Sequence, residues 1–345
     1  MYVDRYRFAQ EPEALAGAED GAVRALFRGG RGKAGMAVRL LRAFPEVRKA
    51  YRSLRNKESR ALFRDLLRYR VAGPYFTRIA NNRELYQALE HACASEPQSE
   101  PLTPAMSDFM GNQIALWTVP YRGRSLQLLG SKVATLLAIE TDQYYYRAGD
   151  VAVQPEQGDV VLDGGAYLGE MSLRFAVDVG PTGQVIGFDP SPRNCALARD
   201  TAQRNGLGER TRFVAAGLGA KSNVAALEET DPPANATSGA PINAGTRVTK
   251  DDKIITVDDY CAWSGLDRVN LLKMDIEGSE IAALDGSRRT IDRHRPKLAV
   301  CLYHRYDDLW KIPNLIRERH PFYDFYLGHH TLHAEETVLY GLPRS

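Results

Sequence analysis

A regular alternation of short apolar runs with helical segments, from Asp159 almost to the C-terminus, constrains the fold of this chain most strongly. The apolar runs are VVLD, QVIGFDP, TRFVAAGLG, VNLLKMDIEG and KLAVCLYHR. Apolar strands that alternate with helices predict a doubly wound α/β fold, in which a mostly parallel sheet is covered by helices on both faces. The final segments, FYDFYLGHH and ETVLYGLP, predict an antiparallel hairpin at one edge.

The residues before this alternation predict a different organisation. Residues 1–105 form a helical N-terminal extension in this interpretation, because GMAVRLLRAF, SRALFRDLLRYRVA and NRELYQALEHACA repeat apolar residues every three or four positions. Within them SEPQSEPLTP, residues 95–104, indicates a connector. Residues 106–150 predict two strands around Arg122-Gly123 and a helix from Lys132 to Tyr145, which bridge to a domain at 151–345. The stretch 220–250 predicts a surface loop.

Charge and cysteine content bound the partners and the location. Residues 24–70 hold fifteen Lys and Arg against three acids, so an anionic surface is a candidate contact, with a solvated helical face as the favoured alternative. The four cysteines form no closely spaced pair, which is typical of a reducing compartment. No apolar run has the length of a signal peptide core or a membrane span. We therefore expect a cytoplasmic protein without a transmembrane segment.

The predicted strand ends carry the residues from which a binding site can be built, because ligands of doubly wound sheets bind beyond the carboxyl ends of the strands. The first end is Asp163, followed by glycines at 164, 165 and 169 that permit a tight turn and close approach of a ligand. The spacing D-x-G-x-x-x-G does not fit the pyrophosphate-binding G-x-G-x-x-G turn. S-adenosylmethionine, which has an ammonium group and no phosphate, fits better than a dinucleotide. Asp189, 20 residues after Gly169, ends the second strand, where an acid can accept ribose hydroxyl protons.

The fourth and fifth predicted strands end in a second group of polar residues. Lys273, Asp275 and Glu277 alternate in KMDIEG, which predicts that all three point to one side of the strand. A buried ion pair with a helix-capping acid is the alternative interpretation of these residues. His304 follows the fifth strand and is expected to face the same cleft.

Together these motifs resemble a known family. VVLDGGAYLG, VIGFDPSPRN, LLKMDIEGSEIAALDG, PKLAVCLYHRYDDLWKIPNLI and ETVLYG occur in the order of the FkbM family of class I methyltransferases, over residues 142–341. The resemblance implies a Rossmann-like fold and O-methylation from S-adenosylmethionine, usually of a hydroxyl on a sugar, glycan or secondary metabolite. The chain departs from the family at Tyr167, where Asn is common, at Asp189, where Glu is common, and at Gly328, where Arg is usual.

The resemblance and the strand ends together assign roles to individual residues. The residues expected to bind the cofactor are Asp163, Gly164, Gly165, Ala166, Tyr167, Gly169, Asp189, Pro190, Ser191 and Asp275. Those expected to act in catalysis are Asp275, His304, Lys273 and Glu277. His304 is the preferred base, because a neutral imidazole is well matched to proton transfer near pH 7, and Asp275 is the other candidate.

A metal is not expected. Mg²⁺ on Asp275 and Glu277 is an alternative that ranks below a metal-free site, since neighbouring carboxylates often lack a metal. His329, His330 and His333 are spaced too irregularly to indicate a metal site and are expected to rim the pocket. Residues 1–105 are expected to flank the cleft and to help select the acceptor.

Three rival functions fit parts of the sequence. A nicotinamide dehydrogenase is disfavoured by the glycine spacing. A nucleic-acid 2'-O-methyltransferase would explain the basic stretch, but no RNA-recognition signature with stacking aromatic residues accompanies it. A protein that binds S-adenosylmethionine without turnover is disfavoured by the acids at all three strand ends. We therefore expect a small-molecule or glycan acceptor and no nucleic-acid partner; the sequence leaves the acceptor and the oligomeric state open.

Overall fold

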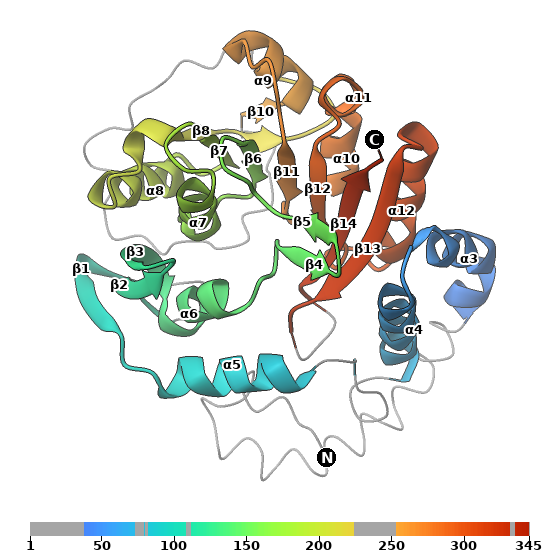
Figure 1. Ribbon diagram of the computed structural model, residues 1–345, viewed down its shortest axis with the longest axis horizontal. Helices are drawn as coiled ribbons and strands as arrows, with labels where there is room; N and C mark the ends of the chain where they lie inside the picture. The colour runs from blue at the N-terminus through green and yellow to red at the C-terminus, as the bar shows by residue number, and fades with distance from the viewer. Residues whose placement is uncertain are drawn as a thin grey trace.

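The computed structural model describes residues 38–72, 79, 82–107, 112–223, 253–331 and 335–344. Its centre is a seven-stranded sheet of order β13-β14-β12-β11-β6-β7-β8 (Figure 1). The strands are β6 (Val160–Gly164), β7 (Gln184–Asp189), β8 (Thr211–Ala215), β11 (Leu271–Met274), β12 (Lys297–Cys301), β13 (Tyr323–His329) and β14 (Thr337–Pro343). All neighbouring pairs are parallel except those of β14, which runs antiparallel to both β12 and β13. The predicted fold class and C-terminal hairpin are confirmed.

The strands are buried on both faces because successive side chains point in opposite directions. Val160 and Leu162 face one core and Val161 faces the other. The first core is covered by α9 (Val257–Ser264), α10 (Glu280–Asp285), α11 (Arg288–His294) and α12 (Asp308–Arg319). The second is covered by α7 (Glu170–Asp178) and α8 (Pro192–Arg204). This arrangement leaves the carboxyl ends of β6, β7, β11 and β12 at one edge of the sheet.

Two predicted elements are shorter than expected. Strand β11 ends at Met274. The Asp275 N–H still donates to the Gly164 carbonyl (3.0 Å), but the chain then turns through Glu277 and Gly278, which have positive φ. The strand alternation predicted for Lys273, Asp275 and Glu277 is therefore wrong beyond Met274. The helical segment expected between VNLLKMDIEG and KLAVCLYHR is divided into α10 and α11 at Gly286, where a Cβ would lie 2.1 Å from the Gly219 carbonyl oxygen.

A second sheet precedes the first. It consists of β1 (Gln98–Ser107), β2 (Gln113–Tyr121) and β3 (Arg124–Ser131), all antiparallel, and confirms the predicted pair around Arg122-Gly123. The connector predicted at 95–104 is wrong, because most of it belongs to β1. Pro101 is tolerated there since β1 lies at the sheet edge and its register shifts between Pro101 and Met106.

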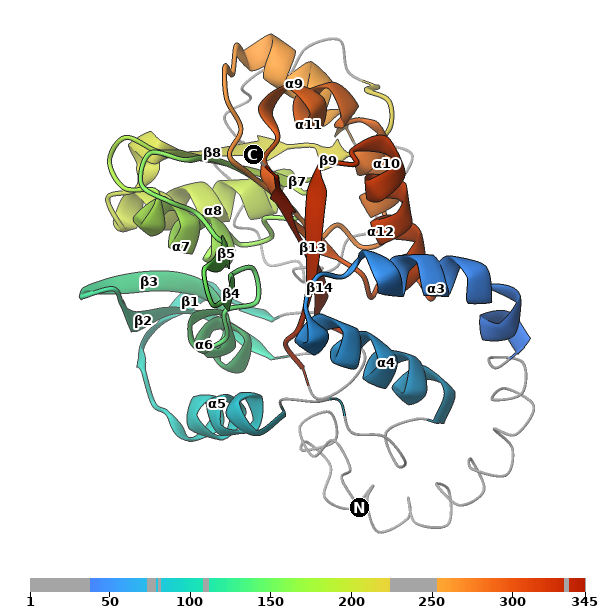
Figure 2. The same ribbon diagram turned by 45° about the vertical axis from the view of Figure 1, so that its right-hand side comes forward.

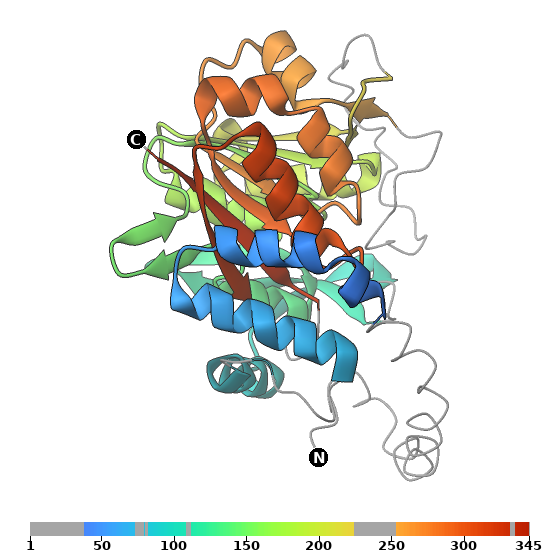
Figure 3. The same ribbon diagram turned by 90° about the vertical axis from the view of Figure 1, so that its right-hand side faces the viewer.

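The predicted helices SRALFRDLLRYRVA and NRELYQALEHACA are present as α4 (Lys57–Ala72) and α5 (Asn82–Ala94). Of GMAVRLLRAF, residues 38–42 are helical, and a further helix, α3 (Phe44–Ser53), begins after Ala43. Helix α3 lies along α12, and α4 packs against β13 (Figures 2 and 3). Val47, Phe63 and Leu66 are buried in the same core as the sheet. Pro45 occupies the first turn of α3, where its missing N–H costs nothing. Most of the predicted 220–250 loop lies outside the described residues.

The segment between the two sheets differs in its second half from the prediction. Helix α6 (Lys132–Glu140) ends before Tyr145, and the short strands β4 (Tyr146–Ala148) and β5 (Val151–Val153) form a hairpin after it. Helix α5 packs against α6. Strands β9 (Gly217–Leu218) and β10 (Ile254–Ile255) pair on the other side of the molecule. The turn between α6 and β4 brings Gln143 and Tyr144 toward the carboxyl ends of the central strands.

Candidate active site

The turn after β6 is built around a glycine that no other residue can replace without movement. Gly165 has φ +79°, and a Cβ there would lie 1.8 Å from the Asp275 carbonyl oxygen. The N–H groups of Gly165 and Ala166 both donate to the Phe188 carbonyl (2.9 Å each). Gly169 begins α7 with φ +90° and approaches Ala198 on α8. The turn after β6 is thereby fixed against the end of β7 and the end of β11.

A buried ion pair supports this turn from below. The Lys273 ammonium lies 2.8 Å from Asp163 Oδ1 and donates to the carbonyls of Gly164 (3.1 Å) and Gly165 (2.8 Å). Ser172 Oγ donates to the other oxygen of Asp163 (2.5 Å). Burial lowers the pKa of Lys273, but the carboxylates of Asp163 and Asp275 outweigh it, so the pKa is raised. Lys273 therefore holds the glycine turn, as the buried-ion-pair alternative predicted.

Asp189 joins the turn after β7 to the turn after β6. One oxygen of its carboxylate accepts hydrogen bonds from Ser191 N (2.9 Å) and Asn194 Nδ2 (3.1 Å), and the other accepts from Tyr167 N (3.2 Å). Burial raises its pKa to about 6 despite these donors. Pro190 and Ser191 follow it, and Ser191 caps α8 through its hydroxyl. The predicted cofactor residues 163–169 and 189–191 thus form one continuous edge.

Asp275 lies beside this edge between two phenols. Tyr144 OH donates to Asp275 Oδ2 (2.6 Å) and Tyr303 OH donates to Oδ1 (2.8 Å). Burial would raise the pKa of Asp275, but Lys273, His304 and the two hydroxyls lower it below its usual value. Burial raises the pKa of Tyr144 and of Tyr303 well above the ordinary range, so both remain protonated donors. Asp275 is therefore a carboxylate with a fixed orientation.

His304 lies on the outer side of Asp275 among three carboxylates. Its Nδ1 is 2.8 Å from Glu280 Oε1, and its Nε2 is 3.4 Å from Asp275 Oδ1 and 3.7 Å from Glu277 Oε2. Burial lowers the pKa of His304, but Glu280 and the other carboxylates raise it to about 9. The expectation of a neutral imidazole near pH 7 is wrong, because these carboxylates keep His304 protonated at that pH.

The comparisons with known proteins bear on this edge of the sheet. Residues 163–331, which begin at the end of β6 and include Asp189, Asp275 and His304, match the model of the methyltransferase FkbM domain. Residues 163–331 therefore carry a methyltransferase FkbM domain. No curated protein matches the sequence.

Several solved structures are similar to this chain, and one of them shares its fold. A methyltransferase FkbM from Methylobacillus flagellatus KT superimposes with a TM-score of 0.55 and 21% identity, covering 88% of this chain. The chain spans 60% of the length of that protein. A methyltransferase from Geobacter sulfurreducens (TM-score 0.36, 17% identity, 63% of this chain and 81% of that one) is more remote. Aeropyrum pernix fibrillarin with natively bound S-adenosyl-L-methionine is also more remote, with a TM-score of 0.38 and 12% identity over 72% of this chain and 100% of that one.

Several residues of the FkbM site were not predicted. Glu336, just before β14, receives a hydrogen bond from Gln143 Nε2, and burial together with Asp275 raises its pKa to about 8. Burial also raises the pKa of Glu170, at the start of α7, to about 8. Glu280 accepts hydrogen bonds from Ile276 N (3.0 Å) and Gly278 N (3.4 Å) as well as contacting His304. PKLAVCLYHRYDDLWKIPNLI and ETVLYG are among the motifs of the resemblance, but the sequence does not show that they converge on Asp275.

The described residues contain one group with the atom types of a metal site. Asp275, Glu280 and His304 offer ligand atoms within 4.8 Å of one another. Both carboxylates also accept hydrogen bonds, from two phenols and from two backbone N–H groups respectively. His329 and His330 instead contact Thr337 Oγ1 (2.9 Å) and Tyr340 OH (2.8 Å). His333 lies outside the described residues.

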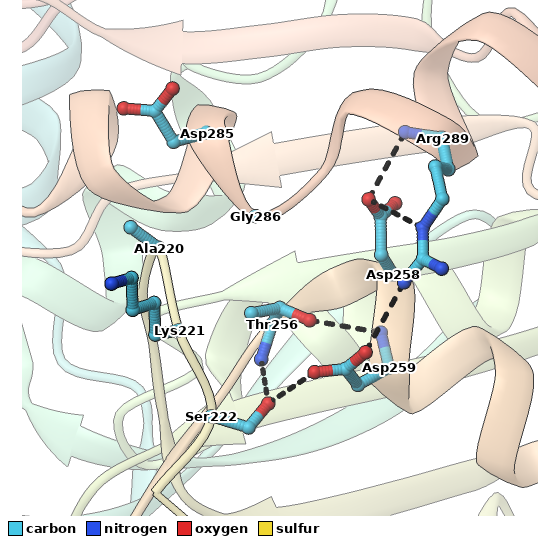
Figure 4. A pocket seen from close by; sticks show the side chains of 9 residues that line it. All are labelled: Ala220, Lys221, Ser222, Thr256, Asp258, Asp259, Asp285, Gly286 and Arg289. Carbon is cyan, nitrogen blue, oxygen red and sulfur yellow. Dashed lines mark hydrogen bonds and ion pairs between the residues drawn. The ribbon is translucent and has the colours of Figure 1, made fainter.

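A separate hollow lies on the other side of the molecule and does not contribute to this site. It is lined by Ala220, Lys221, Ser222, Thr256, Asp258, Asp259, Asp285, Gly286 and Arg289 (Figure 4). Its polar groups bind one another: Ser222 donates to Asp259 (2.6 Å), and the backbone N–H of Arg289 donates to Asp258 (3.1 Å).

Among the described helices, none is long and apolar enough to cross a membrane.

Proposed function

We propose that the chain binds S-adenosylmethionine along the turns after β6 and β7 and transfers its methyl group to a hydroxyl oxygen of a sugar, glycan or secondary metabolite. The observation that carries the proposal is the oriented carboxylate of Asp275, which two phenols hold directly beside the Gly165 turn. The methyltransferase FkbM domain supports the donor and the reaction class.

The cofactor part of the proposal rests on the continuous edge from Asp163 to Ser191. Gly165 and Gly169 let this turn pack directly against the Asp275 carbonyl and Ala198, which gives the edge its shape. The Asp189 carboxylate has a lone pair left on Oδ2 beyond its three hydrogen bonds, and this suits a ribose hydroxyl. Lys273 and Asp163 neutralise each other, so we assign them to the support of the turn.

The chemical part follows from the charges around Asp275. When bound, S-adenosylmethionine supplies an electrophilic methyl group on a sulfonium, so the protein mainly has to align the acceptor oxygen. A hydroxyl acceptor also benefits from a base within hydrogen-bond reach. Asp275 is the base in this proposal, because its lowered pKa keeps it deprotonated at neutral pH and each of its oxygens keeps a lone pair. His304, an imidazolium held by Glu280, orients Asp275 and balances its charge.

Screening hydroxyl acceptors by mass spectrometry for the replacement of one hydrogen by one methyl group tests the proposal. Once an acceptor is found, Asp275→Asn should lower turnover by about 10²–10⁴-fold, since it removes the base and leaves the shape. Turnover should not change when a chelator is added. Full turnover in Asp275→Asn would remove Asp275 from the mechanism, and loss of activity on chelation would show that a metal is required.

A further inference from the structure

The outward face of α3, together with helical residues 38–42 before it, carries a cluster of exposed apolar side chains. Four large hydrophobic residues are exposed within the described part of the chain, and three of them are Val38 (45%), Leu41 (72%) and Phe44 (58%). Single exposed apolar residues are ordinary, but three within seven positions form a patch.

Helix α3 is fixed on the molecule by its buried residues. Val47 and Ala50 are buried in the main core, where α3 packs along α12 (Figure 3). Asn314 of α12 donates to the Glu46 carbonyl (3.0 Å) and to its carboxylate (2.9 Å). Leu40 and Ala43 are partly buried against the same core and anchor the helical residues 38–42. The exposed apolar side chains are thus presented from two anchored helical segments.

Cations surround the apolar side chains. Pro45, Arg48, Lys49 and Arg52 line one hollow with Arg317 of α12. Arg39 and Arg42 are exposed on the helical residues 38–42 before α3, and we call these cations together with Val38, Leu41 and Phe44 the α3 patch. Two acids accompany the six cations: Glu46, which is bound to Asn314, and Glu318, which pairs with Lys49. The α3 patch therefore keeps an excess of positive charge.

We propose that the α3 patch docks the protein on an anionic lipid surface. Phosphate headgroups would pair with the arginines, and the boundary between headgroups and acyl chains would bury Val38, Leu41 and Phe44. A nucleic acid would satisfy the arginines equally well, but it would leave the apolar side chains in water. The proposal is independent of methyl transfer, since the α3 patch contains none of the candidate site residues.

Co-sedimentation of the full chain with vesicles tests the proposal. The protein should pellet with phosphatidylcholine vesicles that contain phosphatidylglycerol and stay in solution with phosphatidylcholine alone. Arg48→Ser with Arg52→Ser should weaken binding about 30-fold, as expected for the loss of two basic contacts. Leu41→Ser with Phe44→Ser should weaken binding at least about tenfold through lost apolar burial.

A matched control variant tests whether binding depends on the α3 patch or on any exposed arginine and apolar side chain of the protein. Trp263 is the fourth exposed large hydrophobic residue and lies on α9; Arg293 is an exposed arginine on α11. Trp263→Ser with Arg293→Ser should leave vesicle binding unchanged. Equal binding to neutral vesicles, or unchanged binding in the Leu41→Ser with Phe44→Ser variant, would overturn lipid docking. An arginine effect without an apolar effect would instead indicate a site for soluble or nucleic-acid anions.

Discussion

His304 is protonated at neutral pH because carboxylates of Glu280, Asp275 and Glu277 lie within 4 Å of its ring nitrogens. Its pKa of about 9 exceeds the ordinary value of 6.5, since these charges outweigh the burial that lowers it. Asp275 responds in the opposite direction, and its pKa is lowered. The site therefore holds a carboxylate, Asp275, beside a cation, His304, and not the neutral histidine base that the sequence predicted.

This charge pairing predicts a pH dependence of stability. A pKa that is raised on folding adds stability fully below the unfolded value of 6.5, and this stability is lost as the pH rises through about 9. At 1.36 kcal/mol per pH unit, the contribution of His304 to the free energy of unfolding is at most about 3 kcal/mol.

Urea unfolding of the protein and of His304→Gln at several pH values measures this contribution. The stability difference between the two should be largest below pH 6.5 and should shrink as the pH rises to 9. A difference that stays constant over this range would show that His304 is not protonated by its surroundings.

At the scale of elements, the carboxyl end of α4 supports the loop that carries His304. Arg70 Nη1 donates to the Tyr306 carbonyl (2.5 Å), and its Nη2 donates to the Leu302 carbonyl (3.4 Å). These carbonyls flank His304 on either side. The N-terminal helices therefore reach the candidate site through a backbone contact, which agrees with a role near the cleft; acceptor selection by residues 1–105 stays a prediction.

Arg70→Met should destabilise the fold by about 2–3 kcal/mol, because buried hydrogen bonds to a charged donor are lost while the apolar stem is kept. Equilibrium unfolding in urea measures the effect, and turnover should also fall because the loop loses its support. Arg64, exposed on the same helix, is the matched control: Arg64→Met should change the stability by less than about 0.5 kcal/mol. Equal stabilities of the two variants would contradict the support of the loop by α4.

For the molecule as a whole, the sequence predicted what depends on local pattern. Apolar strands ending in Asp163 and Asp189 were readable, because period and turn residues are local signals. The sequence did not predict the neighbours of Asp275, which are Tyr144, Tyr303 and Glu336, because they approach it only when segments remote in the chain come together. The charge of His304 depends on Glu280, which precedes it by 24 positions and offers no spacing signal.

The central claim is that S-adenosylmethionine binds at the Gly165 turn, and calorimetric titration tests it most directly. Gly165→Ala should abolish binding, because a Cβ would overlap the Asp275 carbonyl oxygen at 1.8 Å. Gly123→Ala is the matched control, since Gly123 has nearly the same φ (+77° against +79°) and nothing within 4 Å of the added Cβ. The account predicts that the unaltered protein and Gly123→Ala bind S-adenosylmethionine and its demethylated product, and that neither binds NAD. Binding of NAD without a response to S-adenosylmethionine, or unchanged binding in a folded Gly165→Ala protein, would contradict it.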